Sequence, residues 1–245
     1  LSSSAALEIA LLRAFREAFM LPLDDVQMAL LAKRAENDFV GAPVGVMDQM
    51  ACTLASDGKA LFLDTRSLEW KVVPLPPAAQ LIVFNSGIAH NHSRGDYRTR
   101  RAECEEAARR LGVAQLRDLD LSDVPRVREL PDPLGRRARH VITEDARVLD
   151  AVRALEGGDL DVLGALFYAS HDSMRDDYEV SVPEIDLIVE LARSMPEVHG
   201  ARLTGGGFGG SVVMLARPGT AADVAKRVSA AYTAKTGRAG TILVP

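Results

Sequence analysis

The chain is organised around the stretch Glu36-Asn-Asp-Phe-Val-Gly-Ala-Pro-Val-Gly-Val-Met-Asp48-Gln49. Glu36 falls near the end of an expected helix, and Asp48 follows a loop that glycine and proline interrupt. A carboxylate at the C-terminal end of a helix meets an unfavourable dipole, which favours a nearby cation at Glu36, although an ordinary exposed glutamate also fits this position. The sequence neighbours of Asp48 are apolar, so we expect its carboxylate in apolar surroundings, either as a helix cap, the commoner case, or as a catalytic group.

Composition and charge describe an ordinary globular chain. Its 245 residues include 47% hydrophobic and 26% charged residues, enough for one large or two small domains. The net charge of -5 argues against a nucleic-acid partner, and no apolar run approaches the roughly 20 residues that span a membrane. Cys52 and Cys104 lie far apart without metal-type spacing, which favours a reducing compartment and therefore the cytoplasm.

Three serines precede the first helical pattern. Ser2, Ser3 and Ser4 stand before a run with apolar residues at helical spacing, so we expect an amphipathic helix with a serine cap. Its expected apolar face consists of Leu7, Leu11, Phe15 and Ala18. A helix N-terminus also attracts anions, and three hydroxyl groups can bind a phosphate or a cation, but on local grounds a plain cap is the simpler explanation.

Hydrophobic periodicity predicts a mixture of helices and strands along the remainder of the chain. A second helix over residues 24–39 is expected to bury Val26, Leu30, Leu31 and Ala35. Further helices are expected over residues 97–111, 143–155, 160–173 and 221–236, and a capping box at Ser181 and Glu184 opens one more. Strands are expected over residues 60–64, 70–75, 81–84, 201–204, 211–216 and 239–244, with a hairpin signal at Asp57-Gly58 and connecting structure over residues 116–139.

Two further loops carry residues suited to ligands. One joins two expected strands and consists of Gly205, Gly206, Gly207, Phe208, Gly209 and Gly210. It lacks the Gly-Lys-Ser of the usual phosphate-binding loop and opens no helix, yet so many glycines let backbone N–H groups approach a ligand closely. A flexible linker is disfavoured, since a phenylalanine stands between the glycines. His90 and His92 are possible metal ligands, but without a third ligand nearby surface histidines are favoured.

Five segments together resemble the galactokinases of the GHMP family of small-molecule kinases. They are Leu1-Ser-Ser-Ser-Ala-Ala-Leu7, Gly45-Val-Met-Asp-Gln49, Asp96-Tyr-Arg-Thr-Arg-Arg-Ala-Glu-Cys-Glu-Glu106, Ser181-Val-Pro-Glu-Ile-Asp186 and Leu203-Thr-Gly-Gly-Gly-Phe-Gly-Gly210. The first and last resemble motifs that all GHMP kinases share, and the other three are more specific to galactokinases. The family's upstream motif of Arg, Glu, His and Asp has no counterpart, so the chain resembles a galactokinase lacking its N-terminal part, and we expect it to be inactive by itself.

The resemblance implies a role for each matching residue. Asp48 would act as the base, or the electrostatic anchor, for the anomeric hydroxyl of a sugar. The implied substrate-binding residues are Gly45, Asp48 and Tyr97; the implied ATP-binding residues are Ser2, Ser3 and Ser4; the implied Mg²⁺ ligands are Ser4 and Glu36; and the glycine loop of residues 205–210 would brace the site. These residues supply the positioning, charge neutralisation and oriented hydroxyl that phosphoryl transfer needs.

The resemblance also implies a fold and a reaction. The fold would be the α+β GHMP kinase fold, with an N-terminal part like domain 2 of ribosomal protein S5 and a ferredoxin-like C-terminal part. Residues 1–75 would be the remainder of the ATP-binding domain and residues 76–245 the C-terminal domain, unless the chain crosses back near its C-terminus. The reaction would be ATP-dependent phosphorylation of D-galactose to galactose 1-phosphate, without nucleic-acid or membrane partners. A non-catalytic galactose and ATP sensor, or a GHMP kinase for another sugar, are the alternatives.

Overall fold

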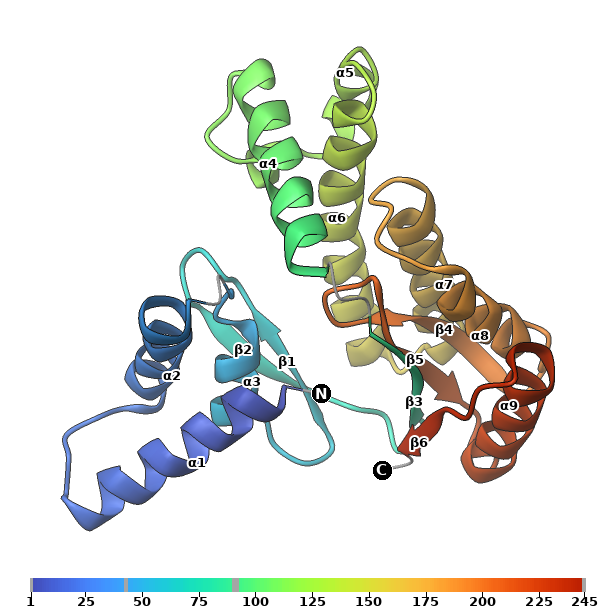
Figure 1. Cartoon of the computed structure of the whole chain (residues 1–245), viewed down its shortest axis with the longest axis horizontal. Coiled ribbons are helices and arrows are strands. Elements are labelled where there is room, and N and C mark those ends of the chain that lie inside the picture. The colour runs from blue at the N-terminus through green and yellow to red at the C-terminus, as the bar shows by residue number, and fades with distance from the viewer. Residues whose placement is uncertain (1, 42–43, 90–92, 244–245) are drawn as a thin grey trace. The chain divides into compact units, whose positions relative to one another are not determined.

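The computed structural model describes residues 2–41, 44–89 and 93–243, and its contacts divide the chain into two compact units, Leu1–Leu75 and Pro76–Pro245 (Figure 1). Each unit combines helices with antiparallel strands, as expected of an α+β chain. His90 and His92 lie outside the described residues, so their placement at the surface stays a prediction. Within the described ranges, every helix is too short or too polar to cross a lipid bilayer.

Unit 1 consists of helices followed by a two-stranded hairpin. In order, its elements are α1 (Ser3–Ala18), α2 (Asp25–Arg34), a π-helical turn η1 (Ala35–Val40), α3 (Met47–Leu54), β1 (Lys59–Leu63) and β2 (Trp70–Pro74). The small core is formed by Ala29, Val46 and Met50, against which the leucines of the hairpin pack. Asp57-Gly58 leads from α3 into β1, so the hairpin signal marks the entry to the first strand and not the turn between the strands.

The apolar face expected for α1 is wrong, and that expected for α2 is right only in part, since Val26 and Leu30 pack against the core of the unit. Leu7, Leu11 and Phe15 are at least half exposed, while α1 buries Ala5 and Ile9. In α2 the buried residues are Met28, Ala29 and Ala32, whereas Leu31 and Ala35 are exposed. Helical periodicity groups residues onto faces, but the face that turns inward is decided by the partner elements, and an apolar side chain is not by itself proof of burial.

Unit 2 contains a four-stranded antiparallel sheet with the order β4-β5-β3-β6. Its strands are β3 (Gln80–Ala89), β4 (Val198–Thr204), β5 (Gly209–Ala216) and β6 (Thr241–Leu243). Since β6 pairs with β3, the last strand belongs to unit 2 and does not cross back to unit 1. The expected stop after Phe84 is also wrong, because β3 continues through Asn85 to Ala89 with a register shift against β5.

Helices cover both faces of this sheet. On one face, α8 (Pro183–Arg193) and α9 (Ala221–Thr236) bury the large apolar core of the unit. The bounds of α9 are those expected from the sequence. On the other face α6 (Leu134–Gly157) and α7 (Leu160–Asp176) pack around Leu215. Gly164 of α7 touches the backbone of β4 so closely that a Cβ atom there would lie 2.1 Å from the carbonyl oxygen of His199. Glycine is therefore required for the close approach of helix and sheet.

A helical corner completes unit 2. It comprises α4 (Ser93–Leu111), the short turns η2 (Leu116–Asp118) and η3 (Leu121–Asp123), α5 (Val124–Val127) and the first half of α6. The start expected for α6, residue 143, is wrong, because the helix already begins at Leu134. Its first turns carry arginines that look like loop or surface residues in sequence, yet Arg137 is buried and its guanidinium is held by Glu103 and Glu179.

The capping box expected at the start of α8 is not formed. The cap residue is Val182, and Pro183 occupies the first turn, where its fixed φ angle suits a helix start. The hydroxyl of Ser181 instead donates a hydrogen bond to Oδ1 of Asp186 at 2.5 Å.

Candidate functional site

The N-terminus of α1 presents serines without a side-chain cap. Ser2 has a left-handed backbone conformation with φ of 49°, and its carbonyl oxygen accepts a hydrogen bond from the N–H of Ala6 at 3.0 Å. The expected serine cap is therefore not formed. Ser3 and Ser4 lie in the first helical turn with exposed side chains. Their hydroxyl groups and the unpaired N–H groups of this turn form a surface that suits an anion.

Glu36 is buried in the π-helical turn η1, so the exposed glutamate considered as an alternative is ruled out. Such turns often occur at functional positions of helices. Oε2 of Glu36 accepts a hydrogen bond from Nε2 of the buried Gln49 at 2.9 Å. Burial raises the pKa of the half-buried Glu8 carboxyl, and the carboxylate of Glu36 raises it further, which places the two acids near each other.

Two oxygen atoms in this acidic cluster are buried without a partner. Oε2 of Glu8 and Oε1 of Gln49 accept no hydrogen bond from any described residue. Among the residues whose side chains the structure describes, no Lys or Arg forms an ion pair with Glu36 either. Buried oxygen atoms without donors are costly unless a ligand or solvent satisfies them.

Asp48 lies in the first turn of α3 and is exposed, so the apolar surroundings expected for its carboxylate are wrong. Val46 and Met50, its apolar neighbours in sequence, point into the core of unit 1 instead. Asp48 does not cap α3 either, because the cap residue is Val46 and no side chain serves as a cap there. The carboxylate is therefore open to a ligand from solvent.

The three helical elements that carry these residues pack on one another. Contacts join α1 with α2, α1 with α3, and α2 with α3. The hydrogen bond between Glu36 and Gln49 connects η1 directly to the helix of Asp48. Ser4 stands one helical turn before Glu8, which neighbours Glu36. The structure thus gathers the elements that hold the serines and both acids within unit 1.

Tyr97 lies near the start of α4 and is 43% exposed. The pKa of Tyr178 is raised, first by burial and also by the neighbouring Cys104 and Tyr97, so the two tyrosines lie close together. Nη1 of Arg100, one turn further along α4, donates to Glu103 at 3.0 Å. This ion pair lies next to the buried Arg137, and together these contacts fix α4 against α6.

Gly45, the other residue expected to contact a sugar, is exposed, and a Cβ atom added to it would meet nothing within 4 Å among the described residues. Neither packing nor a positive φ angle therefore requires glycine at this position. Glycine at this position leaves the backbone open to close approach.

The glycine loop is an ordered connection between β4 and β5. Positive φ angles occur at Gly205, Gly207, Phe208, Gly209 and Gly210. A Cβ atom at Gly207 would lie 2.6 Å from the carbonyl oxygen of Val180, and one at Gly209 would lie 2.5 Å from that of Ile88, whereas Gly205, Gly206 and Gly210 face open space. Two glycines are thus needed for packing, and the other three leave backbone accessible.

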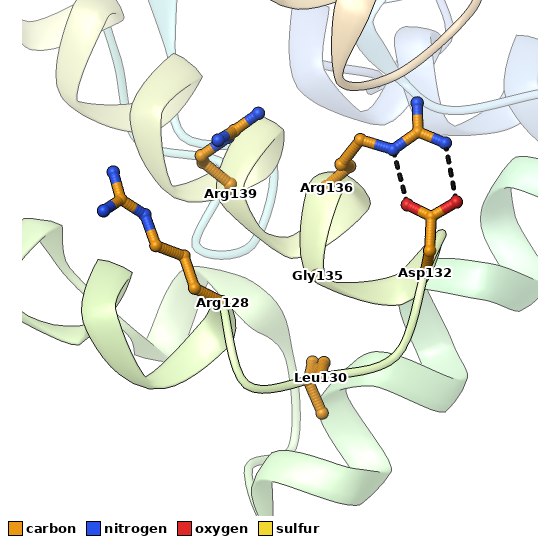
Figure 2. A pocket seen from close by; sticks show the side chains of 6 residues that line it. All are labelled: Arg128, Leu130, Asp132, Gly135, Arg136 and Arg139. Atoms are coloured by element: carbon orange, nitrogen blue, oxygen red, sulfur yellow. Dashed lines mark hydrogen bonds and ion pairs between the residues drawn. The ribbon is translucent and has the colours of Figure 1, made fainter.

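A pocket in the helical corner of unit 2 is lined by none of these residues. Figure 2 shows its lining, which consists of Arg128, Leu130, Asp132, Gly135, Arg136 and Arg139. Two hydrogen bonds, of 2.6 and 2.9 Å, join the guanidinium of Arg136 to the carboxylate of Asp132. Arg139 is paired with Asp177, so most of the positive charge around the pocket is already neutralised.

Sequence reasoning missed Glu8 and Gln49. Glu8 follows Ser4 by four residues, and that spacing places both on one face of a helix, so this signal was available. Gln49 directly follows Asp48, but nothing in its sequence context indicates a bond to Glu36.

Comparisons with known proteins bear on the family and the fold of this chain. The N-terminal domain of the GHMP kinases matches residues 1–56, and the C-terminal GHMP kinase domain matches residues 151–234. A galactokinase of Haemophilus influenzae is 47% identical over 100% of this chain, and that of Pasteurella multocida is 44% identical over 97%. The chain spans 65% and 63% of the length of these two relatives.

Solved structures show the same fold. The crystal structure of Lactococcus lactis galactokinase complexed with galactose has a TM-score of 0.93 and 30% identity, covering 99% of this chain and 64% of that one. The structure of L. major mevalonate kinase shares the fold, with a TM-score of 0.65 and 24% identity. The match covers 99% of this chain and 64% of the mevalonate kinase chain. On the strength of both domain matches and of relatives along its whole length, this chain belongs to the GHMP kinase family.

Proposed function

We propose that the protein containing this chain transfers the γ-phosphate of ATP to the anomeric hydroxyl of D-galactose, giving galactose 1-phosphate and ADP. The observation that carries the proposal is the identity of 44–47% to galactokinases over 97–100% of this chain. Chemical support comes from an exposed carboxylate, Asp48, beside a buried acidic cluster and a serine-bearing helix N-terminus.

In this proposal Asp48 orients the sugar hydroxyl and accepts its proton or stabilises its charge. An exposed carboxylate without a capping role is free for this task. Gly45 and Tyr97 contact the sugar, the first because its backbone is accessible and the second because its ring is partly exposed. The serines at residues 2–4 bind phosphate oxygens through hydroxyl and backbone N–H groups.

Mg²⁺ would be held by Ser4 and Glu36. The residues present fit this ion, because the buried oxygen atoms of Glu8 and Gln49 lack hydrogen-bond donors and Mg²⁺ prefers oxygen ligands. The described residues contain no group of three His, Cys, Asp or Glu side chains able to hold a metal by themselves. Mg²⁺ usually takes further ligands from substrate phosphates and water. When bound, Mg²⁺ neutralises phosphate charge, while Gln49 keeps the Glu36 carboxylate in place.

We also assign the protein to the cytoplasm. Cys52 and Cys104 are both free thiols, which suits a reducing compartment. Fractionation of cells that express the complete protein tests this assignment, and recovery with an oxidising compartment would refute it.

The test of the function uses the complete protein and ATP-dependent phosphorylation of D-galactose. Asp48→Asn should lower turnover by about 10² to 10⁴-fold while ATP still binds. Asp38→Asn is the matched control, because Asp38 is an exposed aspartate of the same unit, and it should leave turnover unchanged. Galactose binding without turnover in the wild type would indicate the sensor, and turnover only on another sugar would indicate a different substrate.

A further inference from the structure

His171 of α7 is a buried side chain that joins two elements of unit 2. It is 1% exposed, and its Nδ1 atom accepts a hydrogen bond from the backbone N–H of Leu203 at 3.3 Å. Leu203 is the second-to-last residue of β4, and only Thr204 separates it from the glycine loop. Because Nδ1 is the acceptor, the neutral ring carries its proton on Nε2. Nε2 lies 3.2 Å from Oδ1 of Asp186, and the two atoms form no hydrogen bond.

The same carboxylate is connected to the other side of the glycine loop. Asp186 Oδ1 accepts a hydrogen bond from the hydroxyl of Ser181 at 2.5 Å. Ser181 follows Val180, whose carbonyl oxygen accepts the N–H of Phe208 at 2.6 Å. Val180 also contacts the loop at Gly207, where no side chain fits. The loop is therefore held at its base through His171 and at its tip through Val180, with Asp186 between them.

We propose that His171 is a positioning residue that, together with Asp186, holds the glycine loop of residues 205–210 in the conformation that the phosphoryl-transfer site uses; this inference rests on the function proposed above. Ordering the backbone costs conformational entropy, and glycine loses the most freedom, so such a loop needs restraints from outside itself. His171 supplies one of them at the strand end, where the chain enters the loop.

The test compares variants of His171 in the complete protein. His171→Ala removes the bond to Leu203 and should lower kcat/KM for galactose phosphorylation at least tenfold. It should also speed amide hydrogen exchange of peptides that cover residues 203–210. His171→Asn keeps an acceptor near the position of Nδ1 and should restore kcat/KM to within about threefold of wild type, which a purely space-filling role would not produce.

The matched control is His199→Ala. His199 lies near the opposite end of β4, and its Nδ1 is 2.7 Å from Oδ1 of Asp161, so it is a second histidine paired with an aspartate. Its replacement should leave both kcat/KM and exchange of the loop unchanged. Equal effects of the two alanine variants, or unchanged loop exchange in His171→Ala, would overturn the inference.

The exchange measurement separates this inference from the proposed function. If wild-type protein does not phosphorylate galactose, the proposed function fails, yet faster loop exchange in His171→Ala still supports positioning. If His171→Ala does not fold, Asp186→Asn takes its place, because it keeps the hydrogen bond to Ser181 and removes the charge beside Nε2. Loop exchange within error of wild type in that variant would refute the role of the His171–Asp186 pair.

Discussion

Acid is expected to destabilise unit 2 through one of its buried histidines, His140 of α6. This residue is 8% exposed, its Nδ1 lies 2.9 Å from Oγ of Ser173, and its ring stacks on Tyr178 with ring centroids 4.3 Å apart. Burial lowers the pKa of His140 from 6.5 to about 4. Four charged groups around it act in opposite directions and are secondary: Glu144 and Asp177 raise the pKa, while Arg147 and Arg202 lower it.

The magnitude follows from the two pKa values. Above pH 6.5 the ring is neutral in both the folded and the unfolded state, so it costs nothing. Between pH 6.5 and about 4 the unfolded chain binds a proton that folded His140 does not, so stability falls as the pH falls. One pKa unit is about 1.4 kcal/mol, so the full loss below pH 4 is about 3 kcal/mol, of which about 2 kcal/mol has appeared at pH 4.5.

The assay is urea unfolding of the complete chain at pH 7 and 4.5, followed by near-ultraviolet circular dichroism of tyrosine. All four tyrosines lie in unit 2, and the single tryptophan, Trp70, lies in unit 1, so the tyrosine signal reports on the correct unit. His140→Phe keeps an aromatic ring against Tyr178 and should lose about 2 kcal/mol less than wild type between these pH values. Ser173→Ala is the control, because it removes the hydrogen bond and keeps the titration. Equal losses in wild type and His140→Phe would refute the reasoning.

Three further predictions follow from the packing and the charges. Asp48→Asn should lower the pKa of the Cys52 thiol, because burial and then Asp48 raise this pKa. The pH profile of thiol alkylation measures the pKa in a background where Cys104 is replaced by serine. An unchanged profile would contradict the influence of Asp48 on Cys52. Gly164→Ala should destabilise the protein by about 1–3 kcal/mol or more in calorimetry, while Gly157→Ala, with open space around its Cβ position, should not. Arg137→Met should cost about 1–3 kcal/mol in urea unfolding, because it removes the buried guanidinium that joins Glu103, Glu179 and the carbonyl oxygen of Asp177. Glu103 keeps Arg100 and Glu179 keeps Arg136 as partners, and a neutral result would contradict the prediction.

Much of the secondary structure could be predicted because it depends on local patterns. The bounds of α9 agree with its apolar spacing, and Gly112 ends α4 in the left-handed conformation that glycine adopts easily. The glycine-rich segment was expected between two strands, and it is found there. Short-range spacing, helix-ending glycines and strand-forming residues carry this information within a few residues.

The faces of the helices in unit 1 could not be predicted in the same way. Periodicity placed Leu7, Leu11 and Phe15 on one face of α1, but Ala5 and Ile9 are the residues that turn inward. Which face is buried depends on how α2 and α3 pack against α1, and these contacts join residues far apart in the chain.

For the candidate site, too, some features follow from the sequence and others only from the tertiary structure. The sequence by itself determined the residue types that the site offers: serines at a helix start, the acids Glu36 and Asp48, and a glycine loop. Only the tertiary structure decided that Glu36 is buried against Gln49 and that Asp48 is exposed. The physical reason is that burial and hydrogen bonding are set by partners brought together from distant positions. Arg137 is the extreme case, since its two carboxylate partners lie 34 and 42 residues away and nothing in its own neighbourhood marks it as buried.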